Sequence, residues 1–594
     1  MSSETYDVVI VGGGTSGLVL ANRLSENPKL QVIVLETGED RSKDPNTLTP
    51  GAWPMLSNSS ADWTFHTAPQ KDLTRQITIP QGKALGGSSA INSFLFTPTS
   101  RATVKAWNNL GNEGWDYAAF EAAMKKSFTL HKPSNVTEGN GPLQLSLAAP
   151  ESLWEKAWIE GLGSVGLPES DPLSGNLGGP IIAPESIDPK TKQRSYATNA
   201  YLDPIRSRSN LMIRTETTVT KVLLEKSSSG GDAVAKGVQT ISKDGVSHII
   251  GARKEVIISG GSINSPRILE LSGIGRADLL QSLGIDVVVD NPHVGENLQN
   301  HIFSGLGFEV RDDVDTIDAF FRQEPEAVAL AMQDYGTKGT GPLSTSNMIT
   351  MAQLPLPDLH TENGSKDLDK LLGLLDPALD VSLSPQTTPA FATAHQAFIR
   401  SILTNPLEPV GNYVFGPAYA PFEAPSPTYR APGKHVSIAI ELSHPLSRGS
   451  VHITSSAPSH ASTNEGLTID PRYFSHPLDL EVLARQVQFT EDLITRAAPL
   501  TQYLKPYTKR FDDLEVAKEY VLRTADAAYH YTGTCSMMPR EIGGVVDSRL
   551  RVYGVANLRV CDASVVPLEP TANPQAVVYA VAEMGAGFVR EDVL

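Results

Sequence analysis

Cysteine is almost absent from this chain of 594 residues, which contains only Cys535 and Cys561. Two cysteines are too few for a disulfide framework, and no metal-ligand spacing surrounds either of them. We therefore expect both to be small buried apolar side chains, and we expect no metal site.

Positive charge is also scarce, since 49 Lys and Arg residues stand against 66 Asp and Glu residues and give a formal net charge of −17. Proteins that bind nucleic acids draw affinity from clustered Lys and Arg, and the sequence shows no such cluster. This balance argues against a nucleic-acid partner and favours a small-molecule one.

Long apolar runs are missing as well. No run reaches the roughly 18 residues that cross a bilayer, and a strand-like segment begins at Tyr6 with no basic, apolar leader before it. We expect no membrane partner and a cytoplasmic location. The alternative is a secreted protein whose leader has been removed, which the Asn-x-Ser/Thr triplets at Asn58, Asn135 and Asn363 would suit.

The length and composition fit a large globular enzyme. A chain of 594 residues exceeds the size at which one core stops growing, so at least two packing units are expected. Hydrophobic residues make up 40 % and charged residues 19 %, which is ordinary for a folded soluble chain.

A strand–turn–helix–strand pattern opens the chain. The β-branched run Tyr6–Val11 predicts a strand buried on both faces, residues 15–27 have helical periodicity, and QVIVLE predicts a second strand ending at Glu36. Between the first strand and the helix lies a GxGxxG motif formed by Gly12, Gly14 and Gly17. This order predicts a Rossmann-type dinucleotide site, against the alternative of a glycine-rich turn with no ligand.

Each part of this motif has a physical reason. Gly12 allows the tight turn, Gly14 lets the backbone approach a pyrophosphate, and Gly17 lets the helix pack closely on the strand. The helix N-terminus, with Thr15 and Ser16, supplies a positive pole for phosphates. Glu36 stands where an acid can accept hydrogen bonds from a ribose diol, but the motif does not choose between FAD and NAD.

Three further stretches extend over nearly the whole chain. The first is QGKALGGSSAINS at residues 81–93, followed by Trp107 and Trp115. The second is GGSINSPRILELSGIG at 260–275. The third is the C-terminal block YHYTGTCSMMP from Tyr529, VYGVANLRVCDASVVP at 552–567 and PTANPQA at 570–576. These stretches resemble the glucose-methanol-choline (GMC) family of FAD oxidoreductases, fungal type, with Ser262 where that family more often has alanine.

The resemblance implies that FAD is the cofactor and assigns contacts to it. The residues implied are Gly87, Ser88, Asn92, Val219, Asp562, Ala563 and Pro574. Some family members attach FAD through a histidine, but the matching position here is Ile91, so noncovalent FAD is expected. From the residues alone, the 86–89 loop is a tight turn, Val219 a core valine and Asp562 a helix cap.

The resemblance also points to His530 and Asn573 as the catalytic pair. A neutral imidazole can accept a hydroxyl proton near neutral pH, and a carboxamide can hold the substrate oxygen without exchanging protons. Without the resemblance, a histidine between Tyr529 and Tyr531 is more often a satisfied core residue.

The fold implied is α/β (α+β overall), with a Rossmann-like FAD-binding domain and a discontinuous substrate domain built on an antiparallel sheet with helices. We assign 1–310 mainly to FAD binding, 311–535 mainly to substrate binding, and 536–594 to a C-terminal return to the FAD domain. We expect one strand around Val219 within 211–225, and two strands in 436–453 joined by a turn at 445–449. Residues 355–385 predict loops, either a lid over the pocket or a surface insertion.

The function expected is oxidation of an alcohol by proton abstraction and hydride transfer to flavin, in a GMC-type alcohol oxidase or dehydrogenase. Its partners would be a small alcohol substrate and an acceptor, either oxygen or a quinone, with secondary metabolism as the setting and a monomer or homodimer as the assembly. One alternative is a cyclase or lyase with structural FAD, and another is a flavin-bearing binding protein without turnover.

Overall fold

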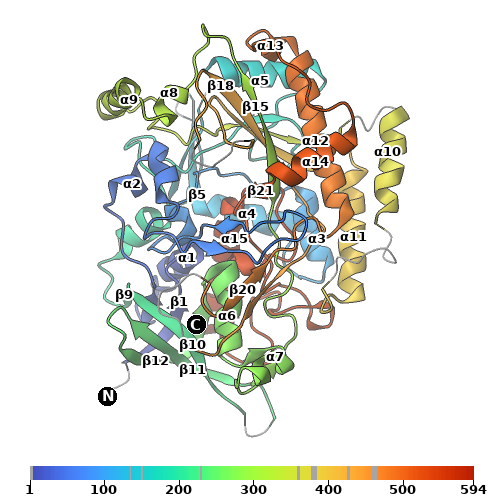
Figure 1. Ribbon diagram of the computed structural model, residues 1–594. Helices are drawn as coiled ribbons and strands as arrows, with labels where there is room; N and C mark the ends of the chain where they lie inside the picture. The colour runs from blue at the N-terminus through green and yellow to red at the C-terminus, as the bar shows by residue number, and fades with distance from the viewer. Residues whose placement is uncertain are drawn as a thin grey trace.

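The computed structural model describes residues 4–593 except 134–135, 149–151, 228–229, 358–361, 376–383, 424–428 and 458–463. Two large β-sheets organise this part of the chain. Figure 1 shows the first sheet toward the bottom of the view and the second toward the top.

The first sheet has the strand order β10-β11-β12-β1-β2-β9, with β22 beside β12. Its strands are β1 (Glu4–Val11), β2 (Val32–Leu35), β9 (Leu211–Arg214), β10 (Thr217–Glu225), β11 (Val234–Ser242), β12 (Ser247–Ile258) and β22 (Leu558–Val560). Strand β1 lies at the centre, parallel to both β2 and β12. Its Val8, Val9 and Ile10 are fully buried, as a parallel strand covered on both faces requires.

The turn from β1 into α1 (Thr15–Leu24) depends on two glycines. Gly12 has φ +103°, a left-handed conformation that side chains rarely adopt. A Cβ on Gly17 would lie 2.0 Å from the carbonyl oxygen of Gly12, so only glycine lets α1 pack this closely on the turn.

The second sheet is antiparallel and has the order β21-β15-β18-β17-β16-β8. Its strands are β8 (Pro180–Ile182), β15 (Ile302–Glu309), β16 (Thr350–Leu354), β17 (Gly411–Gly416), β18 (His435–Leu442) and β21 (Asp526–Ala527). Its members therefore come from four distant parts of the sequence. The fold is mixed α/β, with a Rossmann-like sheet and an antiparallel sheet in one chain.

Helices cover both sheets. Helix α15 packs against α1 and α4, and α12 packs against α14 and against strands β15 and β18. The bounds are α1 as above, α2 (Pro45–Leu48), α3 (Arg101–Asn109), α4 (Tyr117–Ser127), α5 (Leu153–Ser164), α6 (Gly261–Leu271), α7 (Ala277–Ser282), α8 (Asp318–Phe321), α9 (Pro325–Lys338), α10 (Glu362–Gly373), α11 (Pro389–Leu403), α12 (Pro477–Arg496), α13 (Ala498–Thr501), α14 (Leu514–Thr524) and α15 (Gln575–Val593).

Smaller sheets and short 3₁₀ turns complete the architecture. The small sheets pair β3 (Phe65–His66) with β4 (Thr78–Ile79), β13 (Ile274–Gly275) with β14 (Val289–Asp290), β19 (Ser450–Ile453) with β20 (Leu467–Asp470), and β5 (Phe128–Lys132) with both β6 (Val136–Gly139) and β7 (Leu143–Ser146). The 3₁₀ turns η2 (Gly87–Ala90) and η8 (Ala563–Val565) contribute to the site described below.

The two strands predicted in 436–453 exist, but they do not pair with each other. β18 belongs to the large antiparallel sheet, whereas β19 pairs with β20. The connecting segment is buried, and its backbone binds elsewhere: the N–H groups of Leu446 and Ser447 donate to Asp479, and that of Gly449 donates to the Leu298 carbonyl. The expected hairpin turn is therefore wrong, because this segment crosses the interior instead of reversing at the surface.

Two further expectations need correction. The strand expected over 211–225 is divided into β9, which pairs with β2, and β10, which pairs with β11; Glu216 between them takes a left-handed conformation with φ +52°. The loops expected over 355–385 contain helix α10, anchored by an ion pair between Arg485 and Asp367. Residues 358–361 and 376–383 of that stretch lie outside the described part.

Both cysteines are free and buried, as predicted. No helix in the described ranges has the length and apolar character that spanning a membrane would need. Among the Asn-x-Ser/Thr triplets, Asn58 is exposed, Asn135 lies outside the described residues and Asn363 falls in α10.

Candidate functional site

One cavity of about 450 Å³ reaches both large sheets and collects the residues predicted for the site. Those that line it are Gly12, Gly14, Thr15, Ser16, Glu36, Gly87, Ser88, Asn92, Val219, His530, Asp562, Ala563, Asn573 and Pro574. Gly17 is not among the lining residues, because its place is the contact between α1 and the Gly12 carbonyl.

The N-terminus of α1 forms one end of the cavity. Gly14 is its N-cap, and a Cβ there would have as its nearest neighbour the Cα of Gly87, at 3.7 Å. The hydroxyl of Ser16 is buried, yet it has no hydrogen-bond partner among the described residues. The backbone N–H groups of the first helical turn, the helix dipole and this hydroxyl together suit the phosphates of a dinucleotide.

Glu36 follows β2 and lies at the same end. Its carboxylate accepts hydrogen bonds from the backbone N–H groups of Gly13, at 2.8 Å, and Gly38, at 2.7 Å. Burial raises the pKa of Glu36 to about 7. The carboxyl is thereby fixed beside the glycine turn, where a ribose diol would be met.

Asp562 combines two roles. Its Oδ1 accepts from the Ser564 N–H and caps η8, while its Oδ2 accepts from the Gly261 N–H at 2.8 Å and from the Ser265 hydroxyl at 2.6 Å. The helix-cap interpretation and the cavity-wall position are therefore both present. Burial raises the pKa of this carboxyl.

A buried arginine holds the loop at Asn92. The Oδ1 of Asn92 accepts from Nη1 of Arg194 at 2.7 Å, and its Nδ2 donates to Gln575. Arg194 stacks on Phe94, 3.7 Å from the ring centroid, and burial lowers its pKa to about 9. Sequence reasoning missed Arg194, since no motif marks it. Ile91 also lines the cavity and offers no nucleophile for a covalent bond to FAD. This agrees with noncovalent FAD, which stays a prediction.

His530 and Asn573 meet on the cavity wall. Nε2 of His530 lies 3.0 Å from Nδ2 of Asn573, although 43 residues separate them in sequence. Tyr529, in a left-handed conformation with φ +66°, turns the chain so that the His530 N–H donates to Asn300. Asn573 precedes α15, and its Oδ1 is buried without a partner in the described part of the chain.

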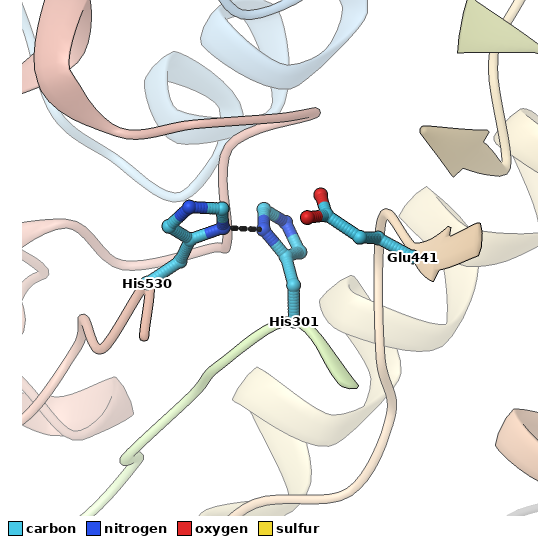
Figure 2. Close-up of side chains that lie close together, drawn as sticks. All are labelled: His301, Glu441 and His530. Atoms are coloured by element: carbon cyan, nitrogen blue, oxygen red, sulfur yellow. Dashed lines mark hydrogen bonds between the residues drawn. The ribbon is translucent and has the colours of Figure 1, made fainter. Parts of the chain in front are cut away.

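Two residues that the sequence interpretation missed complete this region. Figure 2 shows His301 between His530 and Glu441, with its ring beside that of His530. Nδ1 of His301 lies 2.8 Å from Nδ1 of His530, and burial keeps the pKa of His530 well below its usual value. Glu441, on β18, also lines the cavity; it accepts from Asn412 at 2.7 Å, and burial raises its pKa to about 7.

A signal for each was present in the sequence. His301 ends the mostly polar run ENLQNH just before a strand, and Glu441 is the one charged residue in the mostly apolar run VSIAIEL. A charged residue inside a strand that the sequence predicts to be buried indicates a functional position.

One ligand atom from each of His301, Glu441 and His530 lies within 4.8 Å of the others, a spacing that a metal ion could use. The contact between the two imidazoles has the length of a hydrogen bond. Tetrahedral zinc with nitrogen ligands at about 2.0–2.1 Å would hold them about 3.3 Å apart. The geometry therefore favours a hydrogen-bonded pair of histidines.

Family models decide what this site belongs to. The N-terminal GMC oxidoreductase model matches residues 6–303, and the C-terminal GMC oxidoreductase model matches residues 445–582. The chain belongs to the GMC oxidoreductase family.

Known proteins resemble this GMC oxidoreductase over almost its whole length. The GMC oxidoreductase family protein Mala s 12 of Malassezia sympodialis is 35 % identical over 99 % of this chain and 93 % of its own. Dehydrogenase citC of Monascus ruber is 33 % identical, with 99 % and 96 % covered.

Solved structures of FAD-dependent oxidoreductases also resemble this chain over almost its whole length. An FAD-dependent oxidoreductase from Chaetomium thermophilum superposes with a TM-score of 0.86 at 28 % identity, covering 99 % of both chains. A fungal aryl-alcohol oxidase superposes with a TM-score of 0.80 at 27 % identity, again covering 99 % of both chains. FAD is the cofactor of this GMC oxidoreductase, and the unpartnered Ser16 hydroxyl and open Gly14 fit it.

Proposed function

We propose that this GMC oxidoreductase oxidises an alcohol group on a small organic substrate, with His530 as the general base and Asn573 as the group that holds the substrate oxygen. The observation that carries the proposal is the 3.0 Å contact between Nε2 of His530 and Nδ2 of Asn573 on the cavity wall.

The two side chains have complementary tasks. A substrate oxygen that enters between them can accept the amide N–H of Asn573 and donate its own O–H to Nε2 of His530. FAD, when bound, supplies the acceptor for the hydrogen and electron pair that leave the carbinol carbon. Since burial keeps the pKa of His530 low, its imidazole is neutral at physiological pH and can accept the hydroxyl proton.

The remaining wall suits an apolar alcohol. Phe303, Met348, Val414 and Ala439 line the cavity on the side of the antiparallel sheet, together with Tyr529 beside the base. Apolar walls with a few convergent polar groups are typical of small-molecule sites. The similarity to an aryl-alcohol oxidase supports the same substrate class.

None of the described residues of 355–385 lines the cavity, so we propose no lid there. Oxygen and a quinone remain the two candidate electron acceptors. Fungal relatives support a role in fungal metabolism, while the cytoplasmic location and the oligomeric state stay predictions.

Anaerobic mixing of the FAD-loaded protein with a series of aliphatic and aryl alcohols tests the proposal. Bleaching of the flavin absorbance is expected with at least one of them. His530→Ala should keep its FAD but reduce flavin about 10²–10⁴-fold more slowly, because a general base contributes that much to rate.

His131→Ala is the matched control, since His131 is only partly buried and lies outside the cavity wall. Wild-type reduction kinetics in His530→Ala would overturn the base assignment. Product formation without any bleaching would instead favour the cyclase or lyase alternative, and binding with neither outcome would favour a binding protein.

A further inference from the structure

His301, the buried histidine beside His530, determines which ring nitrogen of His530 carries a proton. His301 has no exposed surface, and its Nε2 contacts two backbone carbonyl oxygens, those of Pro570 at 2.8 Å and Ser443 at 3.0 Å. Carbonyl oxygens only accept hydrogen bonds, so Nε2 of His301 must be the protonated nitrogen.

The other nitrogen of His301 then has to accept. Burial lowers the pKa of His301 to about 4, so the ring is neutral near pH 7 and carries a single ring proton, on Nε2. Its Nδ1 is therefore a lone pair, 2.8 Å from Nδ1 of His530. Two facing lone pairs at that distance would repel, so Nδ1 of His530 must carry the proton that joins the rings.

We infer that His301 is a positioning residue that locks His530 in the tautomer with Nδ1 protonated, which leaves Nε2 bare toward Asn573 and the cavity. The inference rests on the proposed role of His530 as the base. It deepens that role because only a bare Nε2 can take a proton from the substrate.

The contact at the other end of this chain of hydrogen bonds fits the same tautomer. Nε2 of His530 faces Nδ2 of Asn573 at 3.0 Å, and an amide N–H there requires a bare ring nitrogen. The direction of donation thus runs from Asn573 to His530, then to His301, and ends at the Pro570 and Ser443 carbonyls. The opposite tautomer would lose the contacts at both nitrogens of His530.

Two substitutions of His301 test whether its role depends on the hydrogen-bond acceptor at Nδ1 or on the donor at Nε2. His301→Asn keeps an oxygen near the position of Nδ1, which can accept from His530. His301→Gln places its amide near the position of Nε2, where it can still donate to the carbonyls, but it leaves no acceptor for His530. Both variants lose the imidazole, and the Asn side chain is one methylene shorter than the Gln side chain.

The direct measurement is the tautomer of His530 in the FAD-loaded protein labelled with ¹⁵N-histidine, with His530→Ala used to assign its signals. We expect a bare Nε2 in the wild type and in His301→Asn, and loss of that preference in His301→Gln. Flavin reduction by an alcohol should then fall at least about tenfold further in His301→Gln than in His301→Asn, since a wrong tautomer disables a base.

A bare Nδ1 on His530 in the wild type would overturn the inference, as would equal tautomers and equal rates in the two variants. Sensitivity of the Nδ1 signals to added Zn²⁺ would instead indicate a metal site shared with Glu441, and would also overturn it. The tautomer is read without substrate. If His530 has a bare Nε2 but no alcohol is oxidised, the proposed function is wrong and this inference stands. If an alcohol is oxidised but Nδ1 of His530 is bare, this inference is wrong and the proposed function stands.

Discussion

Asn573 holds its position through the start of a long helix rather than through its own partners. It lies two residues before the first residue of α15. Among the described residues its Nδ2 contacts His530, and its Oδ1 has no partner. A buried amide with an unused acceptor is costly unless a ligand completes it.

Replacing this amide tests the positioning role. Asn573→Leu conserves size but removes both polar atoms, so kcat/KM for an alcohol should fall about 10–100-fold, the equivalent of roughly 1–3 kcal/mol for one hydrogen bond to the reacting group. Asn573→His retains a ring N–H donor and should recover part of the loss. Steady-state kinetics with FAD content as the control measure this, and a Leu variant with wild-type kcat/KM would show that the amide does not touch the substrate.

The motifs that resemble the GMC family point to His530 and Asn573, and the structure brings these two side chains together, but no motif predicts the residues around them. His301 and His530 stand 229 residues apart, and their contact exists only because β15 and the C-terminal block meet in the folded chain. Glu441 reaches the cavity from β18, the strand that pairs with β15. Contacts of this kind are properties of tertiary packing, which periodicity and spacing do not encode.

At the scale of elements, the β1–α1 turn places a helix N-terminus against the cofactor cavity. Gly14 and Gly17 lie one helical turn apart there, but they face different surroundings. A Cβ on Gly17 would clash with the Gly12 carbonyl at 2.0 Å, whereas a Cβ on Gly14 would stay 3.7 Å from its nearest neighbour. The φ of Gly14, −77°, also accepts an alanine.

Alanine at these two positions should therefore affect the Tm of the apoprotein differently, although both substitutions should weaken FAD binding. Gly17→Ala must push α1 away from the turn, and we expect a lower Tm and loss of bound FAD. Gly14→Ala should keep the Tm of the apoprotein and weaken only FAD, because its methyl group enters the cavity. Thermal unfolding of apo and FAD-loaded samples separates the two effects. Equal Tm values for both apoprotein variants would contradict the packing argument.

Helices and strands could be predicted where the local sequence pattern agrees with the contacts that the segment makes in the folded chain. The strand expected over Tyr6–Val11 and the helix expected to begin at Thr15 are present as β1 and α1. The hairpin expected at 445–449 failed because Asp479, from α12, binds the backbone of that segment. A Pro-Leu-Ser-Arg-Gly segment is typical of a surface turn, and only the packed molecule makes it an interior crossing.

At the scale of the whole molecule, folding takes several carboxyl groups out of water. Glu36, Glu441 and Glu569 are all nearly inaccessible, and burial raises the pKa of each, that of Glu569 to about 8. A carboxyl that binds its proton more tightly when folded stabilises the folded state at low pH. That contribution is lost as the pH rises from its ordinary value of 4.5 through the raised value.

Glu569 allows this to be measured away from the cavity wall. Its carboxyl accepts from Thr532. Its Oε1 has no hydrogen-bond partner in the described chain and lies 3.8 Å from Nε2 of His301, so Glu569→Gln keeps the shape but cannot ionise. Near pH 5 the variant should be no more stable than the wild type. Its free energy of unfolding relative to the wild type should then rise toward pH 8, by up to about 1.4 kcal/mol per pH unit.

Denaturant unfolding at pH 5, 6, 7 and 8 measures the difference, with Glu326→Gln at an exposed position of α9 as the control. A difference that stays constant across this range would mean that Glu569 does not change its protonation on unfolding.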